Sequence, residues 1–290
     1  MTNNKFSRVI SGCMSWGEWG RQFSSKEMIS LMHHCIENEI TTFDHADIYG
    51  GYSTEKDFGI AFSQSNIKRK QIQLISKCGI QYQAETRNNK VKHYNYSKDY
   101  IIWSVEESLR NLQTDYLDAL LLHRPSPLMH PQEVMEAIAK LAQEGKIKDF
   151  GVSNFTPSQM ELIASEVPVT INQIEFSITT HSAMHDGTLD YILQHKITPM
   201  SWSPLGTVFK EDTEQTRRIH KQLGELIDKY EATEDQLLLA WIMKHPAGIH
   251  PVVGTANPDR LVNAIKASKI DLDLEDWFLI LVASQGHKVP

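Results

Sequence analysis

Four polar side chains in this sequence follow apolar runs in a pattern that suits proton transfer. Asp44 closes the apolar run 40–43, and Tyr49 comes five residues later, directly before a pair of glycines. Lys77 and His123 end two later apolar runs. A carboxylate, a phenol, an ammonium group and an imidazole can together hold and deliver a proton, provided that the fold brings them to one place.

The chemistry that such a set favours is the donation of a proton by Tyr49. A phenol has a pKa of about 10, and a cation ~4 Å away at an effective dielectric of ~20 favours the phenolate by roughly 4 kcal/mol, or about three pKa units. Lys77 can supply that charge, and Asp44 can keep the lysine protonated and in place. His123 would hydrogen-bond the oxygen that receives the proton. We therefore expect Lys77 to lower the pKa of Tyr49.

These residues also have alternative explanations that the sequence leaves open. Lys77 could be a surface lysine and His123 a hydrogen-bonded core histidine. A second alternative is the metal site of a barrel hydrolase, with ligands drawn from Asp44, His45, Asp47 and His123. No HxH or HExxH spacing supports that site, and Lys77 would repel a divalent cation, so we expect no metal.

Short apolar runs alternate along the chain with longer segments of helical period. The predicted strands cover residues 8–15, 40–46, 72–77, 115–123, 147–153, 171–176, 199–203 and 251–253. The predicted helices cover residues 25–39, 53–63, 98–111, 131–144, 157–166, 189–195, 213–230, 234–244 and a segment that begins at 258. About eight strand–helix units without a linker favour one α/β domain over residues 1–290, a (β/α)8 TIM barrel, rather than two doubly wound domains.

Active sites of such barrels collect at the carboxyl ends of the strands. In chain order, the residues at predicted strand ends are Asp44, Lys77, His123, Ser153 with Asn154, Gln173 or Glu175, and Trp202 with Ser203. Ser153 and Asn154 could also cap the helix that follows them. Polar side chains at so many strand ends nevertheless favour a single shared site.

Composition and charge exclude several other classes of protein. The 290 residues are 41% hydrophobic and 22% charged, and the net charge of -7 is spread without a basic block, so we expect no nucleic-acid or membrane partner. The three cysteines form no CxxC pair, and no apolar run has the length of a signal peptide or membrane span. We expect a cytoplasmic protein that is a monomer or a weak oligomer.

Seven segments, in this order and spacing, resemble the aldo-keto reductase family over essentially the whole chain. They are Phe43–Gly50, Ser76–Lys77, Leu121–Arg124, Gly145–Phe155, Asn172–Gln173, Ser201–Gly206, and Val253–Asn257 with Arg260. The ending Gly286–Pro290 is similar to the YdhF-type bacterial branch of that family. The resemblance implies a (β/α)8 barrel that reduces an aldehyde or ketone to an alcohol by hydride transfer from NAD(P)H.

The resemblance also implies roles for individual residues. The catalytic tetrad corresponds to Asp44, Tyr49, Lys77 and His123, with Tyr49 as the proton donor. The cofactor residues follow along the chain: Ser153, Asn154 and Gln173 for the nicotinamide amide, Trp202 for the ring, Ser203, Pro204, Leu205 and Gly206 for the pyrophosphate, and Gly254, Thr255, Asn257 and Arg260 for the adenosine end. Many relatives have a tyrosine in place of Trp202.

Two features of the sequence bear on the choice of cofactor. No GxGxxG follows a predicted strand, so a Rossmann site is not expected. Arg260 suits a 2′-phosphate because its planar fork can make two parallel hydrogen bonds. Many family members carry a lysine where this chain has Gly254, which removes one phosphate contact. We expect NADP (NADPH), with NAD less favoured.

The sequence indicates less about the substrate than about the cofactor. Trp16 and Trp19, in the first loop, and the long polar loop 79–97 are expected to overhang the pocket, which suggests a fairly apolar carbonyl substrate. The same fold in some relatives serves as a cofactor-binding regulatory or interaction subunit, which is the alternative function. The complete tetrad favours an enzyme.

Overall fold

Eight parallel strands close into a barrel in the computed structural model, which describes residues 5–164 and 167–290. The barrel strands are β1 (Ile10–Gly12), β2 (Thr42–Asp44), β3 (Gln73–Cys78), β6 (Leu117–Leu122), β7 (Ile147–Ser153), β8 (Ile171–Glu175), β9 (Thr198–Trp202) and β10 (His250–Val253). Their neighbour order is β1-β10-β9-β8-β7-β6-β3-β2, and β1 closes the ring by pairing with β2. The predicted (β/α)8 TIM barrel is confirmed.

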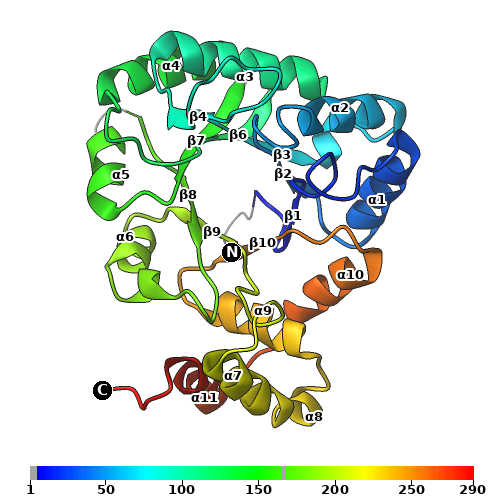
Figure 1. Ribbon diagram of the computed structural model, residues 1–290, viewed down its shortest axis with the longest axis vertical. Coiled ribbons are helices and arrows are strands. Elements are labelled where there is room, and N and C mark those ends of the chain that lie inside the picture. The colour runs from blue at the N-terminus through cyan, green and yellow to red at the C-terminus, as the bar shows by residue number, and fades with distance from the viewer. Residues whose placement is uncertain (1–4, 165–166) are drawn as a thin grey trace.

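Helices surround this barrel (Figure 1). They are α1 (Ser25–Glu37), α2 (Thr54–Gln64), α3 (Lys98–Leu112), α4 (Pro131–Gln143), α5 (Pro157–Ala164), α6 (Thr188–Gln194), α7 (Glu214–Gly224), α8 (Ile227–Tyr230), α9 (Glu234–Lys244), α10 (Pro258–Ala267) and α11 (Leu274–Gln285). The predicted end of the helix 157–166 lies outside the described residues. Among the described helices, none combines the length and the apolar character needed to cross a membrane.

Some elements differ from the sequence-based prediction. The helix expected over 213–230 is divided into α7 and α8. The two short strands β4 (Ile80–Gln81) and β5 (His93–Tyr94), which pair as an antiparallel hairpin outside the barrel, were not predicted because two residues show no periodicity. Helix α11 was also missed, because its apolar residues extend from the buried Ile280 round to the exposed Leu274 and leave no clear polar face.

The core consists of two layers. Inside the barrel, a cluster of buried side chains combines Phe6 with strand residues Ile10, Ile75, Ala119, Leu121, Ile171, Met200 and Val252. A larger cluster packs the outer faces of the strands against the helices. Alternation along each strand explains the division, because successive side chains point to opposite faces.

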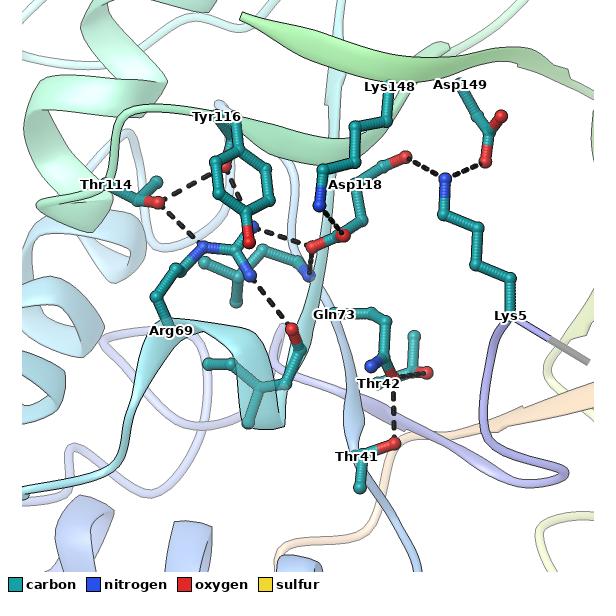
Figure 2. Close-up of polar contacts among 12 residues, drawn as sticks. Lys5, Thr41, Thr42, Arg69, Gln73, Thr114, Tyr116, Asp118, Lys148 and Asp149 are labelled. Atoms are coloured by element: carbon teal, nitrogen blue, oxygen red, sulfur yellow. Dashed lines mark hydrogen bonds and ion pairs between the residues drawn. The ribbon is translucent and has the colours of Figure 1, made fainter.

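Polar contacts join the amino-terminal ends of β3, β6 and β7 (Figure 2). The buried Asp118 carboxylate accepts hydrogen bonds from Arg69 Nη2 at 2.6 Å, Leu74 N at 3.0 Å and Lys148 Nζ at 3.2 Å. The Arg69 guanidinium also lies 3.9 Å from the centre of the Tyr116 ring. These contacts join the amino ends of the strands, so the carboxyl ends, where the sequence predicts the site, remain free to carry function.

Candidate active site

The tetrad predicted from the sequence meets at the carboxyl ends of β2, β3 and β6. Asp44 is the last residue of β2, Lys77 lies one residue before the end of β3, and His123 directly follows β6. Tyr49 comes from the loop after β2, where the backbone N–H groups of His45 and Asp47 bond to the carbonyls of β3. The loop is therefore tied to the barrel wall.

Lys77 is the centre of this group. Its Nζ donates to Asp44 Oδ2 at 2.7 Å, to the carbonyl oxygen of His45 at 2.8 Å and to Tyr49 Oη at 3.1 Å. An ammonium group has three N–H donors, so all of them are used. Burial alone lowers the pKa of Lys77, but the charge of Asp44 and the hydrogen bonds outweigh it and the pKa is raised. The lysine is held as a cation against the tyrosine oxygen.

The pKa of Tyr49 is raised, whereas we expected from the sequence that Lys77 would lower it. Lys77 does lower it, as predicted, but burial has the larger effect and raises the pKa above its ordinary value. Tyr49 is half-buried, so the phenolate would lose part of its hydration in this site, and the Asp44 carboxylate adds repulsion. Tyr49 is therefore a neutral phenol in the free protein. Because Lys77 donates to its oxygen, the phenol O–H stays available for another acceptor.

His123 lies beside Tyr49 with its ring centre 6.2 Å from the phenol ring centre. Burial, followed by the positive charges of Lys77, Arg124 and Lys92, holds the pKa of His123 well below its usual range. Its Nδ1 is buried, and no described residue hydrogen-bonds it. A neutral imidazole here can donate one N–H to an oxygen placed next to the tyrosine.

The residues proposed to hold the nicotinamide lie side by side on neighbouring strands: Ser153 ends β7, Gln173 is in the middle of β8 and Trp202 ends β9. Ser153 Oγ donates to the carbonyl oxygen of Gln173 at 2.8 Å. The Asn154 side-chain oxygen accepts from Glu175 N at 2.9 Å and from Trp202 Nε1 at 3.2 Å, so it fixes the indole ring. Asn154 adopts φ 55°, a left-handed conformation that asparagine tolerates better than most residues.

The segment 203–206 forms a tight turn beside them. Ser203 and Gly206 have φ values of 50° and 53°, and Gly206 N donates to the carbonyl oxygen of Ser203 at 2.8 Å. A Cβ on Gly206 would lie 2.0 Å from Thr179 Oγ1, so only glycine fits. Pro204 is buried and Leu205 packs against the core, which anchors the turn.

The residues proposed for the adenosine end lie in the loop after β10 and in the first turn of α10. Asn257 caps α10 by accepting from Arg260 N at 3.2 Å, and Thr255 Oγ1 accepts from Asn257 N at 3.2 Å. Arg260 is exposed and takes part in none of the ion pairs found in the described chain. A Cβ on Gly254 would meet nothing within 4 Å, so the space for a longer side chain is present although the chain does not use it.

The two tryptophans proposed as pocket walls have different surroundings. Trp16 is 0% exposed and packs against Phe43 and Phe58 in the core, so it does not overhang the pocket as expected. Trp19 is 38% exposed, with its ring centre 6.3 Å from that of Tyr49 and 5.1 Å from that of Tyr82. Apolar contacts with α2 and β2 draw Trp16 inward, whereas Trp19 stays beside the tetrad.

Two residues near the site were missed in the sequence. Tyr82, in the loop 79–97, lies against Trp19, and its backbone N–H donates to Tyr52 Oη at 2.8 Å. Arg124 directly follows His123; its Nη1 donates to Ser153 Oγ at 3.1 Å, and its guanidinium lies 5.0 Å from the centre of the Trp202 ring. The position of Arg124 next to the predicted histidine was the available signal.

A cavity of about 440 Å³ borders the proposed nicotinamide residues. Its lining includes Arg124, Asn154, Glu175, Asp186 and Trp202. No member of the predicted tetrad is in its lining. Over the described residues, no three His, Cys, Asp or Glu side chains are arranged to hold a metal ion.

Comparison with known proteins agrees with this fold. The sequence pattern of the Aldo/keto reductase family matches residues 8–281, and the chain belongs to this family. It is 45% identical to the uncharacterized oxidoreductase YcsN of Bacillus subtilis, over 99% of this chain and 97% of that protein. It is 38% identical to the oxidoreductase YdhF of Escherichia coli, over 99% of this chain and 96% of that protein.

Further relatives have more specific names. The 6-dehydroglucose reductase of Agrobacterium fabrum is 35% identical, over 98% of this chain and 96% of that protein. The crystal structure of the thermostable aldo-keto reductase Tm1743 with the inhibitor epalrestat is similar with a TM-score of 0.82 and 26% identity, covering 97% of both chains. An aldo/keto reductase from Klebsiella pneumoniae in complex with NADP and acetate is similar with a TM-score of 0.79 and 26% identity, covering 97% of this chain and 92% of that one.

Proposed function

We propose that this protein reduces an aldehyde or ketone to an alcohol with NADPH, and that Tyr49 donates the proton. The observation that carries the proposal is that the buried Lys77 Nζ contacts Asp44 Oδ2 at 2.7 Å and the half-buried Tyr49, through its Oη, at 3.1 Å. Membership of the aldo/keto reductase family supports the same chemistry. A buried cation that donates to a phenol oxygen stabilises the phenolate that remains when the phenol gives up its proton.

The chain's own residues explain how the proton would be delivered. NADPH, when bound, supplies the hydride that makes the carbonyl oxygen negative. His123, as a neutral imidazole, donates a hydrogen bond to that oxygen and orients it. Tyr49 then gives up its proton, and Lys77 stabilises the phenolate left behind. Asp44 keeps Lys77 charged and in place throughout.

The residues around the strand ends fit such a cofactor. The turn 203–206 is closed by the hydrogen bond from Gly206 N to the carbonyl oxygen of Ser203, and Gly206 lies against Thr179 and Ser177, so the proposed pyrophosphate segment is held in one conformation. Ser153, Asn154 and Gln173 offer amide and hydroxyl groups to the nicotinamide amide, and Trp202 offers an aromatic face. Thr255, Asn257 and Arg260 at the start of α10 would hold the adenosine end, with Gly254 beside them.

The preference for NADPH over NADH rests on Arg260. Its guanidinium is exposed and unengaged by the carboxylates of the described chain, so it is available to a 2′-phosphate. The similar Klebsiella pneumoniae structure was determined with NADP, which supports the choice. Because Gly254 provides no side chain, Arg260 is the main phosphate ligand that we propose.

The decisive experiment measures loss of NADPH absorbance with a panel of aldehydes and ketones. Trp19 and Tyr82 give the pocket an aromatic wall, so the panel contains aromatic and aliphatic carbonyls. It also contains 6-dehydroglucose, because one relative carries that substrate in its name. Turnover of at least one carbonyl is expected. Tight NADPH binding without turnover of any of them would instead support the alternative, a cofactor-binding regulatory subunit.

A further inference from the structure

Gln173 joins the proposed cofactor residues to the catalytic tetrad. Its side-chain Nε2 donates to Asp44 Oδ1 at 2.9 Å. Gln173 lies on β8 and Asp44 on β2, which occupy opposite positions in the ring of eight strands, so the bond crosses the barrel interior. The two residues are 3% and 2% exposed, so water does not weaken the contact.

The direction of this hydrogen bond follows from charge. Asp44 already accepts from Lys77 through Oδ2, and a carboxylate paired with a lysine can only accept. The amide nitrogen of Gln173 must therefore face Asp44, and its amide oxygen is directed away. Both oxygens of Asp44 are held, one by Lys77 and one by Gln173.

The contacts form one continuous chain of hydrogen bonds. It runs from Gln173 to Asp44 at 2.9 Å, from Asp44 to Lys77 at 2.7 Å, and from Lys77 to Tyr49 at 3.1 Å. A carboxylate held at one oxygen alone can rotate, whereas one held at both oxygens presents a fixed partner to the lysine. The position of Lys77 against the phenol therefore depends on a residue of β8.

We propose that Gln173 is a positioning residue for proton donation: it fixes Asp44, and through Asp44 and Lys77 it sets the strength of Tyr49 as an acid. The amide oxygen left free by this orientation would accept from the NH2 group of the nicotinamide amide. One side chain would then link cofactor binding to the proton donor. The link to the cofactor rests on the proposed function, whereas the link to Tyr49 does not.

The first test compares Gln173→Leu with Ser153→Ala, which alters a proposed nicotinamide contact and the hydrogen bond to the Gln173 backbone carbonyl but keeps the Gln173 side chain that holds Asp44. For Gln173→Leu we expect kcat to fall roughly tenfold, the effect of losing a hydrogen bond to a charged group. We also expect the high-pH limb of the kcat profile, where kcat falls because Tyr49 loses its proton, to shift to higher pH by about half a unit or more. A loosened Lys77 stabilises the phenolate less, so the phenol keeps its proton to higher pH. Ser153→Ala should raise KM for NADPH and leave the limb in place.

The second test needs no substrate. Tyrosine labelled with ¹³C at the ring carbon that bears oxygen gives a resonance for Tyr49, assigned by its loss in Tyr49→Phe. In the free protein, Gln173→Leu should shift this resonance and Ser153→Ala should not, because only the former disturbs the contact of Lys77 with the phenol. Gln173→Asn, which keeps the amide but is one methylene too short, should give the same shift and replaces Gln173→Leu if that variant does not fold.

The two tests separate this inference from the proposed function. If the wild type turns over no carbonyl, the proposed function fails while the resonance of Tyr49 still reports on Gln173. If Gln173→Leu folds with an unmoved Tyr49 resonance and, in an active enzyme, changes only KM for NADPH, then Gln173 is a cofactor ligand alone and the inference is overturned.

Discussion

Tyr49 is a weak acid in the free protein, because burial outweighs the effect of Lys77 on its pKa. Its contribution should therefore appear during the reaction, when negative charge develops on the substrate oxygen. Tyr49→Phe should reduce carbonyl turnover by roughly 10² to 10⁴, the usual share of a positioned acid. Steady-state kinetics measures this loss, and the NADPH dissociation constant, from fluorescence titration, should stay within about threefold. Near-normal turnover would contradict the assignment.

Lys77 and Asp44 should behave as one unit. Lys77→Met removes the charge beside the phenol, and Asp44→Asn removes the partner that holds that charge at 2.7 Å. Once either is lost, losing the other should cost little more, so we expect the double variant to be much less impaired than the sum of the single losses in activation free energy. A double-mutant cycle on kcat/KM measures this coupling. Additive losses would mean that the two residues act separately.

Arg260 should distinguish the two dinucleotides. If it holds the 2′-phosphate, Arg260→Ala removes a charge-assisted contact of about 1.5 to 3 kcal/mol from NADPH and nothing comparable from NADH. The preference for NADPH should fall by roughly ten- to 150-fold. Fluorescence titration of wild type and variant with both dinucleotides measures the change, and Lys266→Ala, at the other end of α10, is the matched control. Equal weakening of both dinucleotides would place Arg260 on the adenine or ribose.

At the scale of elements, the close approach of α2 and α3 depends on Gly59. A Cβ there would lie 2.0 Å from the backbone oxygen of Asn111, which cannot move without shifting the helix. Because α2 follows the loop that carries Tyr49, this contact also supports the site. We expect Gly59→Ala to lower the free energy of unfolding by about 1 to 3 kcal/mol or more, the usual result of overpacking.

The control for this prediction is another helical glycine. Gly224 ends α7, and a Cβ on it would meet nothing within 4 Å. Gly224→Ala should leave the stability unchanged or raise it by up to about 1 kcal/mol, because alanine loses less conformational entropy on folding. Urea denaturation compares both variants with the wild type. Equal stability of Gly59→Ala and wild type would show that the helices can separate at little cost.

At the scale of the whole molecule, stability should depend on two buried carboxyl groups. Desolvation and the nearby Glu55 raise the pKa of Asp47 to about 8, and desolvation raises that of Glu55 to about 7. Asp47 Oδ2 is 3.2 Å from Ser104 Oγ and 3.4 Å from Tyr100 Oη, and Glu55 Oε1 accepts from Ser76 Oγ at 2.5 Å. No charged partner is among these contacts.

The direction in which stability changes with pH follows from proton binding to these two carboxyl groups. The unfolded chain loses these protons at about pH 4, whereas the folded protein keeps that of Glu55 to about pH 7 and that of Asp47 to about pH 8, so their contribution to stability falls as pH rises over these ranges. Asp47→Asn mimics the neutral form and should flatten the dependence, with a gain over wild type on the order of a few kcal/mol at pH 8 and little at pH 4. Urea denaturation at both pH values measures it. A variant curve parallel to that of the wild type would show that Asp47 does not titrate there.

The sequence by itself determined the barrel, the order of its elements and the residues at its strand ends. These features depend on local properties: apolar runs of strand length, helical periods, and glycines in turns. Asp44, Lys77 and His123 could be placed at one face because every strand of a parallel barrel presents its carboxyl end to the same side. The short hairpin β4–β5 and the helix α11 were missed because neither has a clear period.

Only the tertiary structure decided how these residues act on one another. The hydrogen bond between Gln173 and Asp44 joins residues 129 positions apart on opposite strands, which no spacing rule could anticipate. Trp16 proved to be a core residue and Trp19 a neighbour of Tyr49, although they stand three positions apart. The pKa of Tyr49 is raised and not lowered because desolvation depends on every neighbour that excludes water, and its neighbours Trp19, Lys77 and His123 come from separate segments of the chain.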